Sequence, residues 1–166
     1  VVSRMKFAVG LSGICSFKVK STGRLVGQKS YVRDATSTVF SWTTTDLSYV
    51  DRNQVKLKIN NVESTAFTFA SDTSITITDT FSQDFTTSNT TTHTFTWTFN
   101  KTDVSKIRVL KAGVLQTKNV DYRIVGKNVI FIDTNGVPTA LPNSTAVRIY
   151  SADDIVIYLD EWYNLT

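Results

Sequence analysis

Two adjacent pairs of residues carry the groups that acid–base chemistry uses, Asp153-Asp154 and Asp121-Tyr122. Neighbouring residues of a strand point to opposite faces, so Asp153 and Asp154 would not converge on one substrate. For the second pair we favour a structural role over a site: Asp121 accepts backbone N–H groups in a turn, and Tyr122 packs inward. We therefore predict no catalytic residue in either pair.

Residues that bind metals, form disulfides or attack substrates are scarce. Cys15 is the only cysteine and His93 the only histidine, which excludes an internal disulfide and the usual zinc clusters. The sequence has neither a phosphate-binding loop nor a nucleophile elbow. We interpret Cys15 as a small buried hydrophobic residue. The prediction is a protein that is not an enzyme and has no cofactor and no metal site.

Tryptophan side chains could instead form a carbohydrate-binding surface. Trp42 and Trp97 each follow a phenylalanine two residues earlier, and this alternation favours the core for both. Trp162 and Tyr163 differ, because they come after the last predicted strand and break its alternation. Tryptophan and tyrosine dominate the energetics of interfaces, so we predict that this pair anchors a contact.

The two ends of the chain have opposite charge. Residues 1–35 carry seven basic residues and one acidic residue, whereas residues 151–166 carry four acidic residues and no lysine or arginine. Three interpretations are open: the charges lie on solvated strand faces, the ends of one molecule pair with each other, or one end docks on a neighbour. If the ends do pair, we favour docking on a neighbour over pairing within one molecule, because residues 155–159 form an apolar strand that would invite aggregation on an exposed edge. The candidate interface residues are Arg4, Lys6, Lys18, Lys20, Asp153, Asp154, Ile155, Ile157, Trp162 and Tyr163.

Other classes of partner are not predicted. The basic residues of 1–35 alternate with aliphatic residues and not with the aromatic residues that stack on bases, so no nucleic acid is expected. No apolar run is long enough to span a membrane.

Strict alternation of apolar and polar residues predicts an all-β fold. The 166 residues are 41% hydrophobic and only 19% charged, and the abundant threonine suits pleated, half-buried surfaces. In residues 93–99 (HTFTWTF), three aromatic residues face one way and the threonines the other.

Residues 39–78 and 94–132 resemble each other, which indicates an internal repeat. Each segment opens with Phe-x-Trp, continues with an apolar-basic-apolar strand, and reaches a two-residue interruption, Asn60-Asn61 or Ala112-Gly113. Asn and Gly tolerate positive φ, so we predict tight hairpin turns at equivalent positions.

We predict five parts: a basic N-terminal β segment at 1–35, a first β-unit at 36–80, a linker at 81–92, a second β-unit at 93–150 and an acidic C-terminal strand at 151–166. The expected fold is two tandem antiparallel β-sandwich or barrel-like units, preceded by a basic N-terminal β-hairpin segment.

The second unit contains a series of short motifs: Phe95-x-Trp97-x-Phe99, residues 104–109 (VSKIRV), residues 113–115 (GVL) and Asn119-x-Asp121-Tyr122-Arg123. The series resembles the N-terminal attachment domain of the tail fibres of T-seven-like short-tailed phages. Ile124 stands where that family has an aromatic residue, and the first unit has residues 67–69 (FTF) in place of Asp-Tyr-Arg.

The resemblance implies a bacteriophage virion structural protein of the tail-fibre attachment or adaptor type. In that family the domain anchors a fibre to the tail, usually as a homotrimer. The implied partners are other phage structural proteins of the tail, portal-adaptor or fibre, and further copies of the chain, with a trimer as one form. The implied location is the tail or fibre attachment region of the virion. The alternative is a carbohydrate-binding β-sandwich module of a phage receptor-binding protein.

Overall fold

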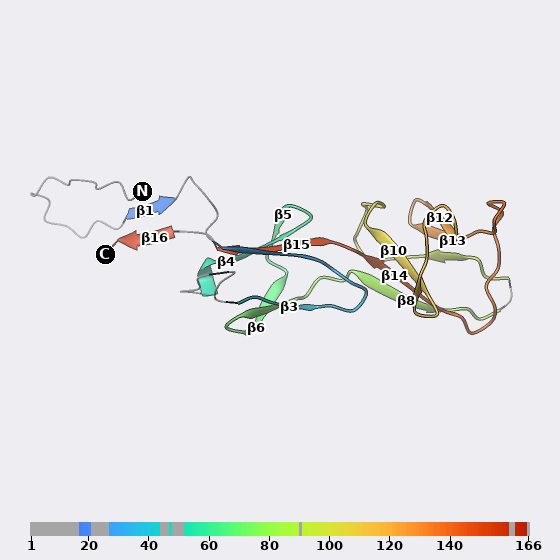
Figure 1. The fold of residues 1–166 in the computed structure, drawn as a ribbon, viewed down its shortest axis with the longest axis horizontal. Helices are drawn as coiled ribbons and strands as arrows, with labels where there is room; N and C mark the ends of the chain where they lie inside the picture. The colour runs from blue at the N-terminus through green and yellow to red at the C-terminus, as the bar shows by residue number, and fades with distance from the viewer. Residues whose placement is uncertain are drawn as a thin grey trace, which may run out of the picture.

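The computed structural model describes residues 17–20, 27–43, 47, 52–89, 91–159 and 162–165. Apart from one short 3-10 helix, η1 (Arg52–Gln54), the regular structure of these residues is β-strand, so the all-β prediction is confirmed. Two β-sandwiches lie end to end along the long axis of the molecule (Figure 1).

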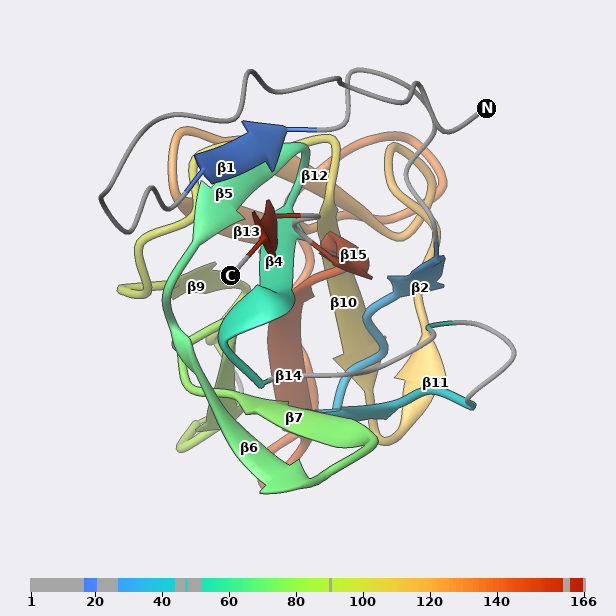
Figure 2. The ribbon, with the colours of Figure 1, turned by 90° about the vertical axis from the view of Figure 1, so that its left-hand side faces the viewer.

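The first unit is a sandwich of two antiparallel sheets with the strand orders β2-β15-β4-β5 and β3-β7-β6. Figure 2, which looks along the long axis, shows β6 and β7 as a separate layer beside β4 and β15. Alternating residues of both sheets enclose a core that includes Phe40, Trp42, Leu57 and Ile75. The strands are β2 (Gln28–Val32), β3 (Val39–Ser41), β4 (Val55–Ile59), β5 (Val62–Ser64), β6 (Phe67–Ser71), β7 (Ser74–Ile77) and β15 (Asp154–Leu159).

The second unit repeats this arrangement, with the strand orders β8-β14-β10-β11 and β9-β13-β12. Phe95, Trp97 and Phe99 all point into its core, as the alternation in residues 93–99 predicts. The strands are β8 (Ser82–Thr86), β9 (Thr94–Thr96), β10 (Ile107–Lys111), β11 (Val114–Leu115), β12 (Tyr122–Val125), β13 (Asn128–Phe131) and β14 (Ala146–Ser151).

The internal repeat extends to the strand register. In the first unit Leu57 pairs with Ile157, and in the second Val109 pairs with Ile149 at the equivalent place. Both predicted turns are hairpin turns with positive φ at two successive residues, Asn60-Asn61 (50° and 66°) and Ala112-Gly113 (48° and 80°). Two further pairs of strands are equivalent, β2 with β8 and β15 with β14, although the sequence comparison did not include them.

The predicted boundaries need correction, because the units are nested and not tandem. The second unit, β8 to β14, lies in the chain between β7 and β15, which both belong to the first unit. The predicted linker 81–92 contains β8, an edge strand whose only apolar residue is Phe85, so its sequence looks like a loop. β2, assigned to the basic segment 1–35, and β15, assigned to the acidic strand 151–166, are both strands of the first unit's sheet.

β1 (Phe17–Lys20) and β16 (Trp162–Leu165) form a separate antiparallel ladder at the end of the molecule that carries the first unit (Figure 1). β1 therefore pairs with the other end of the chain. Residues 1–16, Cys15 included, and 21–26 of the predicted N-terminal segment lie outside the described residues.

Candidate assembly interface

The prediction that Ile155 and Ile157 contact another chain is wrong. Both side chains are completely buried in the first unit's own core, because β15 lies between β2 and β4. An apolar strand at the end of a sequence has the same pattern whether it occupies the edge or the centre of a sheet. The local sequence could not distinguish these two positions.

The adjacent carboxylates diverge, as strand alternation predicts, with Asp153 buried and Asp154 exposed. Asp153 is completely buried, which contradicts its assignment to an exposed docking surface. Asp154 is exposed, and its Oδ2 lies 2.6 Å from Nζ of Lys106. Asp154 therefore joins the first unit to the second within one molecule.

In the described part of the structure, the two ends of the chain pair with each other as strands of one molecule. In the ladder of β1 and β16, Lys20 pairs with Trp162 and Lys18 with Asn164, and Tyr163 lies opposite Val19. The side chains of these residues lie outside the description, as do Arg4 and Lys6 entirely. The prediction that these residues bind a neighbour stays a prediction.

A buried cluster of four charged residues, which we call the junction cluster, joins the two units: Arg33, Asp79, Lys101 and Asp153. Asp79 accepts from Nη1 of Arg33 at 2.8 Å and from Nζ of Lys101 at 2.7 Å. Asp153 accepts from the same Lys101 Nζ at 2.9 Å and lies 3.5 Å from Arg33 Nη1. Each cation thus bridges two carboxylates, so the four charges cancel.

Neighbouring polar and aromatic groups complete the junction cluster. Asn60 Nδ2 and Ser151 Oγ donate to Oδ1 of Asp153 at 2.8 and 2.7 Å. The guanidinium of Arg33 lies over the ring of Phe81, 4.2 Å from its centroid, while Nε and Nη2 of Arg33 are buried without a hydrogen-bond partner. Burying a guanidinium with unpaired N–H donors costs free energy, so the ion pairs with its carboxylate partners must offset that cost.

The chain connections explain why these residues meet. β7 leads into β8 through residues 78–81, and β14 leads into β15 through only Ala152 and Asp153. Asp79 and Asp153 therefore occupy the two crossings between the units. Burial acts to raise the pKa of the Asp79 carboxyl, but the hydrogen bonds and positive charges of Lys101 and Arg33 outweigh it and hold that pKa below its ordinary value.

The junction cluster could not be predicted from local patterns, because its members are far apart in the chain and only Asp153 stood out, as half of an adjacent carboxylate pair. The sequence pattern placed Arg33 in the basic segment 1–35 and Asp79 at the end of the first β-unit, 36–80. Knowledge that the units are nested could have predicted the cluster. The two chain crossings lie side by side, so a carboxylate in each crossing is close to the basic residues around them.

The structural role predicted for Asp121 and Tyr122 is confirmed. Asp121 Oδ2 accepts from the backbone N–H of Thr117 at 2.7 Å, and Tyr122 is buried at 1% exposure. Trp42 and Trp97 are buried in their respective cores at 4% and 1% exposure, which confirms the core assignment over a sugar-binding one.

Two hollows of about 560 and 330 Å³ flank the junction, and Asp79, Asn100 and Lys101 line both. Among the described residues there is no cluster of three or more His, Cys, Asp and Glu that could hold a metal ion. In the same part of the chain, no helix is long and apolar enough to cross a membrane. Comparison of the chain with protein families, curated proteins and solved structures found no match.

Proposed function

We propose that this chain is a structural protein of a bacteriophage virion, of the attachment or adaptor type, which joins tail or fibre components through protein–protein contacts. The observation that carries the proposal is the junction cluster. The buried ions Arg33 and Asp153 fix two copies of one sandwich end to end. A spacer that holds neighbouring proteins at a set distance requires such a rigid connection.

The resemblance to the tail-fibre attachment domain supports this proposal at the level of the fold. Its most recognisable residues, Asp121 and Tyr122, shape a turn and fill the core of the second unit. Residues with these roles specify a fold, and fold does not by itself imply function.

The direct test is to look for the chain in purified particles of the phage that encodes it. Mass spectrometry of gradient-purified particles should detect it at a fixed ratio to the major capsid protein, while a phage replication protein, as the negative control, should be absent. Antibodies against the second unit should label one region at the tail or fibre base. A chain present in the lysate but absent from purified particles would contradict the proposal.

A carbohydrate-binding module is the second candidate, favoured by the polar groups that line the two hollows beside the junction. Their lining offers hydroxyl and amide groups such as Ser64, Gln83, Thr98 and Asn100. The large hydrophobic side chains exposed in the described residues are, however, all valine and leucine, whereas sugar rings usually stack on aromatic faces. Saturable binding of host surface glycans that is lost on Gln83→Ala would favour this candidate over the adaptor.

A further inference from the structure

The outer face of the second unit's four-stranded sheet differs in chemistry from the same face of the first unit. The strand registers place Leu110, Leu115, Ala146 and Ala112 where the first unit has Lys58, Glu63, Asp154 and Asn60. All four positions are apolar in the second unit and polar or charged in the first. Because the backbone is shared, the fold does not require this difference.

Two of these apolar residues, Leu110 and Ala146, line a hollow. Leu115, Leu110, Arg148 and Asp84 form one row across β11, β10, β14 and β8. The hollow, of about 350 Å³, lies beside this row and is lined by Leu110, Gly113, Ala146 and the Asp84–Arg148 ion pair, among others. Leu115 is 57% exposed at the margin of this face.

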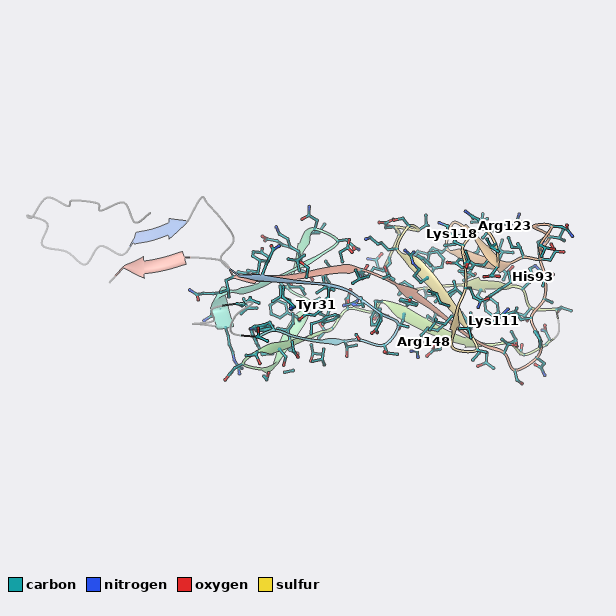
Figure 3. The ribbon with its side chains drawn as sticks, in the orientation of Figure 1. Tyr31, His93, Lys111, Lys118, Arg123 and Arg148 are labelled. Carbon is teal, nitrogen blue, oxygen red and sulfur yellow. The ribbon has the colours of Figure 1, made fainter. Side chains whose placement is uncertain are left out.

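The apolar face continues an interface that the molecule already contains. The β2–β3 connection of the first unit crosses one side of the face, where Ala35 packs with Leu110 against Phe81 and Tyr150. Arg148, labelled on the second unit in Figure 3, donates from Nη1 to the backbone carbonyl of Ala35 at 3.3 Å. The hollow and Leu115 lie beyond this connection and are left open.

We propose that a second copy of this chain covers the open part of the face, in a contact with twofold symmetry. Such a contact requires a surface that is complementary to itself. Here an exposed leucine, Leu115, stands beside a hollow large enough to receive a leucine side chain. A twofold axis that lies in the plane of the contact turns the two faces toward each other and places Leu115 of each copy in the hollow of the other.

The charges of the face are also complementary to themselves. Asp84 lies at one side, and its side chain is 64% exposed even though it is bound to Arg148. Arg108 lies toward the other side, where Nη1 donates to the backbone carbonyls of Ser105 and Ile107. The twofold axis turns Arg108 of one copy toward Asp84 of the other, and the ionised carboxylate still has acceptor positions for it. This pairing does not depend on the proposed virion function.

The test is sedimentation velocity of the whole chain over about 5–500 μM, a range that detects weak dimers. Leu115→Glu and Ala146→Asp each install the residue type that the first unit has at the equivalent position, so both variants should fold. The control is Val62→Glu, which adds the same charge to an exposed valine of the first unit. Thermal unfolding of every variant verifies its fold.

We expect the wild-type chain to form dimers, Leu115→Glu to raise the dissociation constant at least tenfold, Ala146→Asp to weaken the dimer as well, and Val62→Glu to leave it unchanged. A wild-type chain that stays monomeric at 500 μM would overturn the proposal. A trimer, or a dimer that Leu115→Glu does not weaken more than Val62→Glu does, would overturn it equally.

Discussion

The two units share every strand pairing, but they differ at the end where the first unit joins the second. There the first unit has Arg33 and Asp153, whose backbones form an N–H···O bond of 2.9 Å. The second unit has Thr87 and Thr145 at the equivalent places, with the same backbone bond at 3.0 Å. Only the side chains differ, so the fold fixes the backbone of this end and leaves its side chains free to bind a neighbour.

The side chains of the second unit at this end satisfy each other locally. Thr87 Oγ1 donates to the carbonyl of Pro142 at 2.6 Å and accepts from the N–H of Thr145 at 2.7 Å. The first unit uses buried ions at the same end, and the partners of these ions lie at the crossings into the second unit. At this end the second unit has hydroxyl groups that bond within the same unit, whereas the first unit has charged groups that bind the other unit.

Deleting residues 152–166 should separate the two units most clearly. The deletion removes β15, the strand between β2 and β4, so the first unit should unfold. The second unit is continuous from β8 to β14 and should stay folded. Amide hydrogen exchange should show protection lost in residues 28–77 and kept in residues 82–151.

The matched control for this deletion removes residues 160–166 and leaves β15 in place. Protection of both units should then be kept. A first unit that stays protected after the longer deletion would show that β15 is not needed to hold its sheet together.

Truncating the equivalent tryptophans tests whether the two cores are equally important. Trp42→Ala and Trp97→Ala should each lower the free energy of unfolding by about 3–5 kcal/mol, as expected for a buried aromatic side chain. Trp97→Phe should cost more than Trp42→Phe, because Trp97 Nε1 donates to the carbonyl of Lys101 at 3.1 Å, while Trp42 Nε1 is buried without a partner. Urea unfolding measures all four values, and equal costs for the phenylalanine variants would contradict the comparison.

Replacing Arg33 tests whether the junction cluster joins the units. Arg33→Met should destabilise the protein by about 3 kcal/mol, because it leaves buried carboxylates without one of their cations. It should also separate the unfolding of the two units in calorimetry. The control is Thr87→Val at the equivalent position of the second unit, which should cost about 1 kcal/mol for its lost hydrogen bonds. A single cooperative transition in Arg33→Met would mean that other contacts couple the units.

Local patterns predicted the parts of the fold that depend on neighbouring residues. The alternation around Phe95 and Trp97 identified core strands, and the residue types at Asn60-Asn61 and Ala112-Gly113 identified hairpin turns with positive φ. The nesting could not be predicted in this way, because β14 and β15 have similar apolar patterns and only long-range pairing assigns each to its unit. The junction cluster depends on that nesting, so it was missed with it.

Acid should weaken the junction cluster. The pKa of Asp79 lies below its ordinary value, since Lys101 and Arg33 outweigh the effect of burial. The unfolded chain therefore binds this proton more readily, so the stability that Asp79 contributes is complete above the ordinary carboxyl pKa of about 3.8 and is lost as the pH falls below it. The pKa of Asp34 is lowered to about 2, so the stability that Asp34 contributes is also lost as the pH falls.

Calorimetry between about pH 5 and pH 2 should show this loss. The melting temperature of the wild type should fall more steeply on acidification than that of Asp79→Asn, which has no proton to bind at this site. Asp34 contributes equally to both proteins. Parallel curves for the two proteins would contradict the role assigned to Asp79.

The smallest expected effect concerns the two hairpin turns. Ala112 has a φ of 48°, where Asn60 of the first unit has 50°. A left-handed conformation costs an alanine roughly 1–2 kcal/mol, while asparagine tolerates it because its short polar side chain bonds locally. Ala112→Asn should therefore stabilise the second unit by about 0.5–1 kcal/mol, as urea unfolding would measure.

The strained Ala112 also connects this turn to the proposed contact between copies, because it lies on the apolar face with Leu115 and Ala146. If that face binds a second copy, the apolar side chain of Ala112 favours the contact despite its backbone strain. Ala112→Asn should then stabilise the monomer and raise the dissociation constant of the dimer. The reciprocal change, Asn60→Ala, should only destabilise, because it introduces strain and removes hydrogen bonds to Asp153 and Asp154. A variant Ala112→Asn that is less stable than the wild type would show that the turn, and not the contact, determines the residue at this position.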